Sequence, residues 1–235
     1  MKSYFVSLYL PLLVLMLPIQ GCASTGYSAE PIEAWVVDDE TGKPLEGVVV
    51  NAFWVLKQGS YAGGGVAPPP LQVLETVTDS KGRFYFPAWG PIQNTTANSY
   101  FWGNDPLIIL FKRGYDFFYM DNRITGEPTL DPLRKSDWNG ATAKLKKFKG
   151  GNQKYADRID DLEGDYFMFY VGQGYNCDWK KTPRMLVELH RMGEEFERQG
   201  IKIIGYPGKK IGDLKKYSNK GICGSAEEFL RSYLP

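Results

Sequence analysis

The chain has 235 residues with 28 basic and 27 acidic side chains, and its formal net charge of +1 argues against nucleic acid as a partner. Its composition, 43% hydrophobic and 14% aromatic, is typical of a folded domain that can bury a core. The single histidine, His190, and two of the cysteines, Cys177 and Cys223, lack the spacing of metal ligands, so we expect no metal and no cofactor.

The first 21 residues have the organisation of a secretory signal. Lys2 precedes an apolar stretch from Tyr4 to Ile19, and small residues follow it. The pair Gly21-Cys22 resembles the lipobox of bacterial lipoproteins. That resemblance implies removal of residues 1–21, lipidation of Cys22 by acyl chains such as palmitate, and a tether at residues 22–30. The alternative is an ordinary signal peptide that happens to contain a cysteine.

The lipobox resemblance also implies a location. We expect a lipid-anchored protein of the bacterial cell envelope whose membrane partner is reached through Cys22. Because Ala23, and not Asp, follows the cysteine, the resemblance favours the outer membrane, on its periplasmic face or at the cell surface.

Residues 32–87 predict the strands on which the fold depends. Ile32–Val37 and Leu71–Thr78 are strand-like segments that end in turn residues. Val48–Leu56 is apolar at its even positions and mostly apolar at its odd ones, which include Asn51, and this is typical of a central strand covered on both sides. The glycine- and proline-rich insert at Gln58–Pro70 predicts a variable crossover or, alternatively, a binding loop.

Further strands and a turn follow along the chain. Asp79–Gly82 fits a type I turn that closes a hairpin onto the strand at residues 83–86, which Pro87 ends. Leu107–Phe111 predicts another strand, and so does Tyr115–Met120. From Asp121 to Gly140 the pattern is lost, and residues 141–149 predict a last strand or its exit.

Three blocks of this region resemble the carboxypeptidase regulatory-like family. They comprise Asp39, Thr41, Gly42, Pro44, Leu45, Gly47, Val48 and Val50; Val77, Thr78, Asp79, Gly82, Arg83 and Phe84; and Leu107–Phe111 followed by Lys112, Arg113, Gly114 and Tyr115. The resemblance implies a transthyretin-like (prealbumin-like) antiparallel β-sandwich over residues 31–125. It implies no activity, because the matching residues serve turns and strands. With a mainly helical region at 126–235, the expected class is α+β.

Helical signals are confined to the last third of the chain. Residues 155–162 predict a helix, and residues 165–171 are ambiguous between helix and strand. Thr182-Pro183 predicts a helix start, and Gly200 its end. Ser225 and Glu228 have capping-box spacing. One apolar face of the 183–199 helix is predicted from Met185, Leu189, Met192 and Phe196.

Three side-chain groups have candidate roles. Cys177 and Cys223 are expected to form a disulfide in an oxidising compartment, the alternative being two free thiols. Trp89, Tyr100 and Trp102 lie among amide side chains and suit a sugar-binding surface, or else they cap one end of the sandwich. The lysines between residues 144 and 149 suit acidic lipid headgroups or form a solvated face.

These observations favour a non-enzymatic function. His190 lies one helical turn before Glu194, and a surface pairing of the two is expected more than catalysis. The sequence therefore predicts a membrane-anchored binding or assembly module with an envelope protein as partner. The first alternative is a module that binds a polysaccharide or another envelope polymer. The second is a carboxylate-based hydrolase, which no motif supports.

Overall fold

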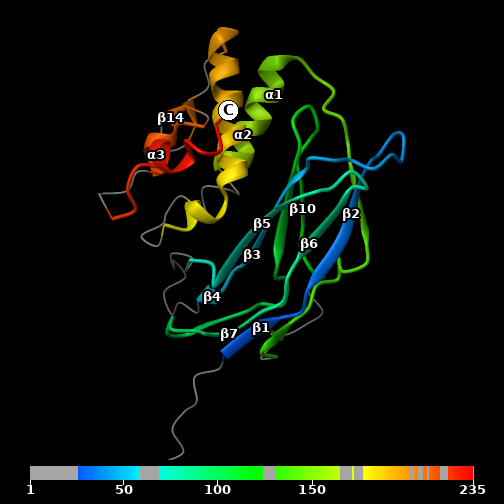
Figure 1. Cartoon of the computed structure of the whole chain (residues 1–235), viewed down its shortest axis with the longest axis vertical. Helices are drawn as coiled ribbons and strands as arrows, with labels where there is room; N and C mark the ends of the chain where they lie inside the picture. The colour runs from blue at the N-terminus through cyan, green and yellow to red at the C-terminus, as the bar shows by residue number, and fades with distance from the viewer. Residues whose placement is uncertain are drawn as a thin grey trace, which may run out of the picture.

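The structure is a computed structural model of the chain. Its sheets and helices are arranged around one central strand (Figure 1). It describes residues 26–58, 69–123, 131–164, 171, 177–201, 204–205, 209–210, 212–217 and 222–234. The expected signal at 1–21, Cys22, most of the insert at 58–70 and residues 165–170 of the ambiguous segment lie outside the described residues. The described part is mostly β, with several small sheets and a few short helices late in the chain, which confirms a β-sandwich-like α+β class.

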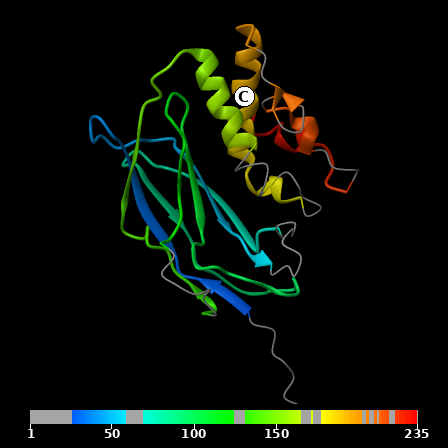
Figure 2. The same cartoon turned by 180° about the vertical axis from the view of Figure 1, so that it is seen from behind.

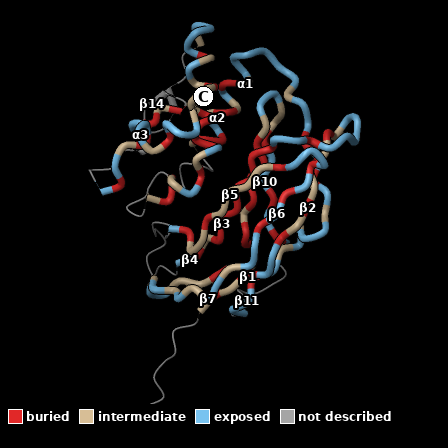
Figure 3. The backbone as a smooth tube through the Cα atoms, in the orientation of Figure 1, coloured by how far each residue is buried: buried red, intermediate tan, exposed pale blue. Residues whose placement is uncertain are grey.

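Strand β3 (Val49–Trp54) occupies the centre, as its sequence predicts. It pairs antiparallel with β5 (Gln72–Val77) on one side and with β9 (Leu107–Phe111) on the other. The short β10 (Phe118–Met120) extends the sheet, whose order is β10-β9-β3-β5. Every residue of β3 is buried, because both faces of this sheet are covered (Figure 3).

The second sheet has the order β12-β2-β6 and covers one face of the first. It consists of β2 (Ile32–Asp38), β6 (Arg83–Phe86) and β12 (Thr142–Leu145). The even-numbered residues of β3 point into the space between the sheets, where Val50, Ala52 and Trp54 meet Phe84 and Phe86. We call this cluster the sandwich core.

The turn at Asp79–Gly82 forms, but it does not close the expected hairpin. Gly82 donates its N–H to the Asp79 carbonyl at 2.8 Å, as a type I turn requires. The strand before the turn pairs with β3, whereas the strand after it pairs with β2 in the other sheet. The turn therefore carries the chain across the sandwich. The local turn residues are the same in either case, and only the partner strands distinguish the two arrangements.

The sheet region also extends beyond the expected limits of 31 and 125. Strand β1 (Gly26–Ala29) falls within the expected tether and pairs with β7 (Trp89–Gln93) and with β11 (Leu133–Arg134). Strand β12 lies beyond residue 125 and pairs with β2. The β1–β11 and β2–β12 pairs are parallel, so the sandwich is not wholly antiparallel. Two residues of β11 are too few for a sequence pattern to reveal. A further small pair joins β4 (Lys57–Gln58) to β8 (Ser99–Tyr100).

Helices cover the outer face of the β10-β9-β3-β5 sheet and lie away from β1 and β7 (Figures 1 and 2). Among the helices of the described ranges, none combines the length and the apolar composition needed to cross a bilayer. The odd-numbered Val49 and Phe53 of β3 pack here with Met185, Leu189 and Met192. We call this cluster the helical-layer core. Its elements are α1 (Asn152–Asp161), the 3-10 helix η2 (Asp178–Lys181), α2 (Pro183–Arg198), the hairpin β13 (Ile204–Gly205) and β14 (Lys209–Lys210), the 3-10 helix η3 (Leu214–Tyr217) and α3 (Ala226–Leu230).

Helix α2 begins and ends where the sequence predicts, but Thr182 does not cap it with its side chain. The Thr182 hydroxyl bonds instead to the Trp179 carbonyl at 3.2 Å. The carboxylate of Glu75, on the neighbouring β5, accepts the free N–H groups of Arg184 and Met185 at 2.8 and 3.0 Å. The cap therefore comes from the sheet, and it joins the helical layer to the sandwich. At α3, Ser225 accepts the N–H of Glu228 at 3.3 Å, as its spacing predicts.

Candidate ligand-binding cleft

The three aromatic residues expected to bind a ligand do not form one flat platform. The indole of Trp89 lies 5.3 Å from that of Trp54, at an interplanar angle of 82°, and packs against the sandwich core. Tyr100 and Trp102 are half-buried neighbours whose ring centroids are 6.2 Å apart. The amide of Asn94 is occupied internally, since it donates to Ser99 at 3.0 Å. In this arrangement Trp89 helps to cap the sandwich, and all three rings are half-buried.

The lysines between residues 144 and 149 divide into two groups. Lys147 and Lys149 form ion pairs with Asp38 and Glu40, at 3.7 and 2.6 Å. Lys144 and Lys146 line a shallow cavity of about 430 Å³ beside strand β10. This separation follows from the alternation of β12 and its exit, and it leaves no single basic stripe.

The carboxylate of Asp38 accepts several hydrogen bonds and pairs with Lys147. The backbone N–H of Thr41, above all, and the hydroxyls of Tyr115 and Thr41 stabilise its charge and lower its pKa to about 2. The Tyr115 bond, 2.9 Å long, ties the segment after β9 to the turn after β2. Asp38 therefore has a structural role within a turn.

His190 is held from two sides. Its Nδ1 lies 3.0 Å from the Gly212 carbonyl, and its Nε2 lies 3.5 Å from the Glu194 carboxylate. A side chain at Gly212 would collide with the His190 backbone at 2.4 Å, so this approach requires glycine. Within the described part of the chain, no cluster of three or more His, Cys, Asp or Glu side chains is placed to hold a metal ion.

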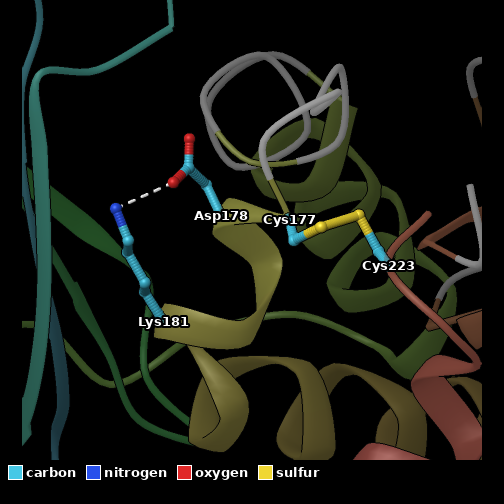
Figure 4. The surroundings of a disulfide bond; sticks show 4 residues. All are labelled: Cys177, Asp178, Lys181 and Cys223. Carbon is cyan, nitrogen blue, oxygen red and sulfur yellow. Dashed lines mark ion pairs between the residues drawn. A yellow bond between two sulfur atoms is a disulfide. The ribbon is translucent and has the colours of Figure 1, made fainter.

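Cys177 and Cys223 are joined in a disulfide between the start of η2 and the segment before α3 (Figure 4). Next to it, the Lys181 ammonium lies 2.8 Å from the carboxylate of buried Asp178. The ring of Trp179 packs edge-on against that of Phe229, with centroids 5.3 Å apart. The covalent bond and the ring pair together fasten α3 to η2, the short helix that precedes α2.

A cleft of about 330 Å³ opens where the ends of the central strands meet α2. Its lining residues come from five parts of the chain: Gly47 and Val49 at the start of β3, Val77 at the end of β5, Phe111 to Arg113 at the end of β9, Arg184, Val187, Glu188 and Arg191 on α2, and Tyr233 near the C-terminus. The α2 positions recur at intervals of three and four, so they share one helix face. The cleft therefore exists only because α2 packs across the strand ends.

Positive charge dominates this cleft. Lys112, Arg113, Arg184 and Arg191 line it, and Glu188 is the one acidic residue of the lining. Glu188 pairs with Arg191 at 3.1 Å, and Glu195, outside the lining, pairs with Arg113. A cleft with walls of one sign concentrates anions, because low-dielectric walls focus the field into it. We define this site as the basic cleft.

The Glu75 cap supports one wall of the basic cleft. The carboxylate lies against the backbone of Arg184, and it also accepts the side-chain amide of Asn51 at 3.2 Å. Burial outweighs these hydrogen bonds and raises the pKa of Glu75 to about 7. The position of Arg184 thus depends on a carboxylate that titrates near neutrality.

Comparison with known proteins finds distant similarity to solved structures. No family model matches the sequence, and no curated protein matches it. Similar solved structures include 3-chlorocatechol 1,2-dioxygenase from Rhodococcus opacus 1CP, with 15% identity, a TM-score of 0.29, and coverage of 53% of this chain and 62% of that chain. A streptococcal ancillary pilin shows 17% identity, a TM-score of 0.26, and coverage of 52% of this chain and 30% of that chain.

A third similar structure is the dioxygenase domain of a dioxygenase–carbohydrate-binding protein fusion from Streptomyces sp. SirexAA-E. Its identity is 15%, its TM-score is 0.29, and the match covers 55% of this chain and 85% of that chain. At such low identities and TM-scores, these similarities carry no argument about activity. The described residues form a β-sandwich with an added helical layer, and the basic cleft lies between the two.

Sequence reasoning did not find the basic cleft. The spacing of Arg184, Glu188 and Arg191 is visible in the sequence as one charged helix face. Such a face usually lies in solvent, and nothing local shows that Lys112 and Arg113 of a distant strand end lie opposite it.

Proposed function

We propose that this protein is a lipid-anchored lipoprotein of the bacterial envelope that acts as a non-enzymatic binding or assembly module. Its sandwich is of the transthyretin-like type seen in carboxypeptidase regulatory-like domains. The observation that carries the binding role is the basic cleft, in which three arginines and a lysine gather at the seam of two layers. The disulfide supports an oxidising compartment, because such bonds persist mainly outside the cytoplasm.

Chain length supports an orientation for the anchored protein. Gly26, the first residue of β1, follows Cys22 by only four positions. Four extended residues span about 14 Å at most, so a lipid on Cys22 would hold β1 close to the bilayer surface. Helix α2, one wall of the basic cleft, lies at the other end of the molecule (Figures 1 and 2). The cleft would then be presented to partners away from the membrane.

Two measurements on intact cells test this proposal. Mass spectrometry of the mature N-terminus should find an acylated Cys22. Crosslinking should recover one reproducible envelope partner from cells with the wild-type protein and lose it with Cys22→Ser. Ser24→Ala is the matched control and should retain both. An unmodified Cys22, or a partner captured equally by Cys22→Ser, would refute the anchored role.

A polysaccharide or another envelope polymer is a second candidate ligand. The observation that favours it is the half-buried pair Tyr100 and Trp102 beside a loop rich in amides. A sedimentation assay with purified envelope glycan tests it directly. Trp102→Ala should abolish sedimentation with the polymer while the fold is retained. Binding that survives this substitution would remove the candidate.

A further inference from the structure

We propose that the basic cleft binds a dianionic group, a phosphate monoester or a pair of carboxylates, that is attached to an apolar portion of its ligand. This inference rests on the proposed role as a binding module and specifies the chemistry of its ligand. It is argued from the charges of the cleft, from the way its cations are held, and from its apolar floor.

The charge count favours a ligand with two negative charges. The lining contributes four cations and one carboxylate, which leaves an excess of three positive charges. Glu195 pairs with Arg113 from outside the lining and reduces the effective excess to two. A dianion would neutralise the site, whereas a monoanion would leave repulsion between the remaining cations.

The cations are held in ways that leave ligand-binding capacity. The Lys112 ammonium donates to the Glu46 carbonyl at 2.7 Å, which fixes its position without neutralising its charge. Arg191 is braced by Glu188 on the same helix, one turn away. The Arg184 guanidinium acts on the buried Glu75 carboxylate through space, and it makes no close ion pair with it within the described ranges. Guanidinium groups bind both carboxylate and phosphate in a bidentate manner, so these side chains suit either group.

The floor of the cleft is apolar. Val49, Val77 and Phe111 of the sheet lie below the cations, and Val187 of α2 forms part of the wall. The Tyr233 ring, 41% exposed, stands at the edge. Such a floor offers nothing to a bare inorganic ion but contributes contact area to a ligand with a ring or an alkyl group. The volume of about 330 Å³ is at the small end of ligand pockets, which suits a single group or the end of a larger molecule.

Calorimetric titration of the full mature chain in detergent tests this inference with four small probes. Phenyl phosphate and phenylmalonate supply the two kinds of dianion on an apolar ring, inorganic phosphate supplies the dianion alone, and benzyl alcohol supplies the ring alone. We expect at least one ring-bearing dianion to bind about tenfold more tightly than inorganic phosphate, because part of the ring is buried. Benzyl alcohol should not bind. Affinity should fall as salt concentration rises.

Substitutions assign the binding to the cleft. Arg184→Gln should weaken binding of the ring-bearing dianion about tenfold, because one charge-assisted contact is lost. Adding Lys112→Gln should weaken it further. Arg198→Gln, an exposed position of the same helix outside the cleft, is the matched control and should leave affinity within twofold. Thermal midpoints of Arg184→Gln and Arg198→Gln should match the wild type, since both side chains are exposed. Lys112→Gln also loses the bond to the Glu46 carbonyl, so circular dichroism of that variant must confirm a retained fold.

Each outcome decides the proposal. Binding of phenyl phosphate alone supports the proposal and assigns a phosphorylated ligand. Binding of phenylmalonate alone also supports the proposal and assigns a carboxylated ligand. Absence of saturable binding by either probe, or equal affinity in the wild type and the Arg184→Gln/Lys112→Gln variant, overturns it. Cell-based failure of the anchored role would leave this result intact, since titration does not depend on Cys22. Conversely, an acylated Cys22 with an empty cleft would refute only the ligand chemistry.

Discussion

The two hydrophobic cores on either side of β3 are held together by different means. The sandwich core lies between two hydrogen-bonded sheets, and its residues come from strands that pair along their lengths. The helical-layer core lies between one sheet and a set of short helices, and its connections to the sandwich are made by side chains. Among them are the Glu75 cap of α2, the Arg158–Asp116 pair at 2.7 Å and the bond that Tyr155 accepts from Gly114 at 2.7 Å.

This difference separates the region that contributes most to stability, the sandwich core, from the boundary with the helical layer, where the basic cleft lies. The sandwich core depends on buried area and backbone pairing, which few single polar changes can remove. The helical layer buries an apolar core of its own, but among the described residues no strand of it pairs with the sandwich sheets. Because side-chain bonds join it to the sandwich, we expect it to loosen first. The basic cleft lies on the boundary between the two, and its geometry follows the attachment of α2.

The largest expected effect is in the sandwich core. Phe84→Ala removes a ring that is 1% exposed and packs edge-on against Phe86. We expect a loss of about 3–5 kcal/mol in the free energy of unfolding, measured by urea denaturation. Tyr85, the next residue, is 45% exposed on the opposite side of β6, and Tyr85→Ala should cost less than about 1 kcal/mol. Equal losses would contradict the inward–outward assignment of β6.

The disulfide should matter to one region only. Replacing both Cys177 and Cys223 by Ala removes a link across 46 residues, which we expect to cost about 2–4 kcal/mol of unfolding free energy. Amide hydrogen exchange should accelerate in η2 and α3, while the amides of β2, β3 and β6 keep their protection. A uniform acceleration in both regions would show that the two cores unfold as one unit.

The Glu75 cap, which joins α2 to the sheet, predicts that the free energy of unfolding depends on pH. Its pKa is raised from 4.5 to about 7 in the folded protein, so the folded state holds the proton more tightly than the unfolded state. The free energy of unfolding should therefore decrease as pH rises from 4.5 to 7, by up to about 3 kcal/mol, and then level off.

Glu75→Gln tests this dependence, because glutamine does not titrate. Its one carbonyl oxygen can replace only one of the two carboxylate oxygens that accept the N–H groups of Arg184 and Met185, so some stability is lost at every pH. The variant should lose most of the pH slope in urea denaturation between pH 4.5 and 7. Glu46→Gln replaces an exposed carboxylate and should keep the slope. A slope that is unchanged in Glu75→Gln would assign it to another group.

The smallest expected effects are at the far end of the sandwich. Trp89→Ala removes a half-buried ring that packs on Trp54, and it should cost about 1–2 kcal/mol of unfolding free energy. Trp102→Ala should cost less than about 1 kcal/mol, because Trp102 neighbours the half-buried Tyr100 ring and is not among the residues packed on the sandwich core. A larger loss at Trp102 than at Trp89, measured by thermal unfolding, would reverse their roles as ligand surface and cap.

The sequence by itself determined the elements whose patterns are local and strong. Val48–Leu56 is apolar on both faces, and that alone required cover on both sides. Leu107–Phe111 and the helix from Pro183 to Arg198 also form as their patterns predict. These assignments succeed because alternation and helical spacing are properties of the chain within a few residues.

Only the tertiary structure decided which segments become neighbours. It assigned the strands flanking Asp79–Gly82 to different sheets, gave the cap of α2 to Glu75, and brought Lys112 opposite Arg184. The physical reason is that a turn, a helix N-terminus or a cation is satisfied by any suitable partner. Which partner it meets depends on the packing of the layers, so the basic cleft has no signature in the chain until α2 lies across the ends of the strands.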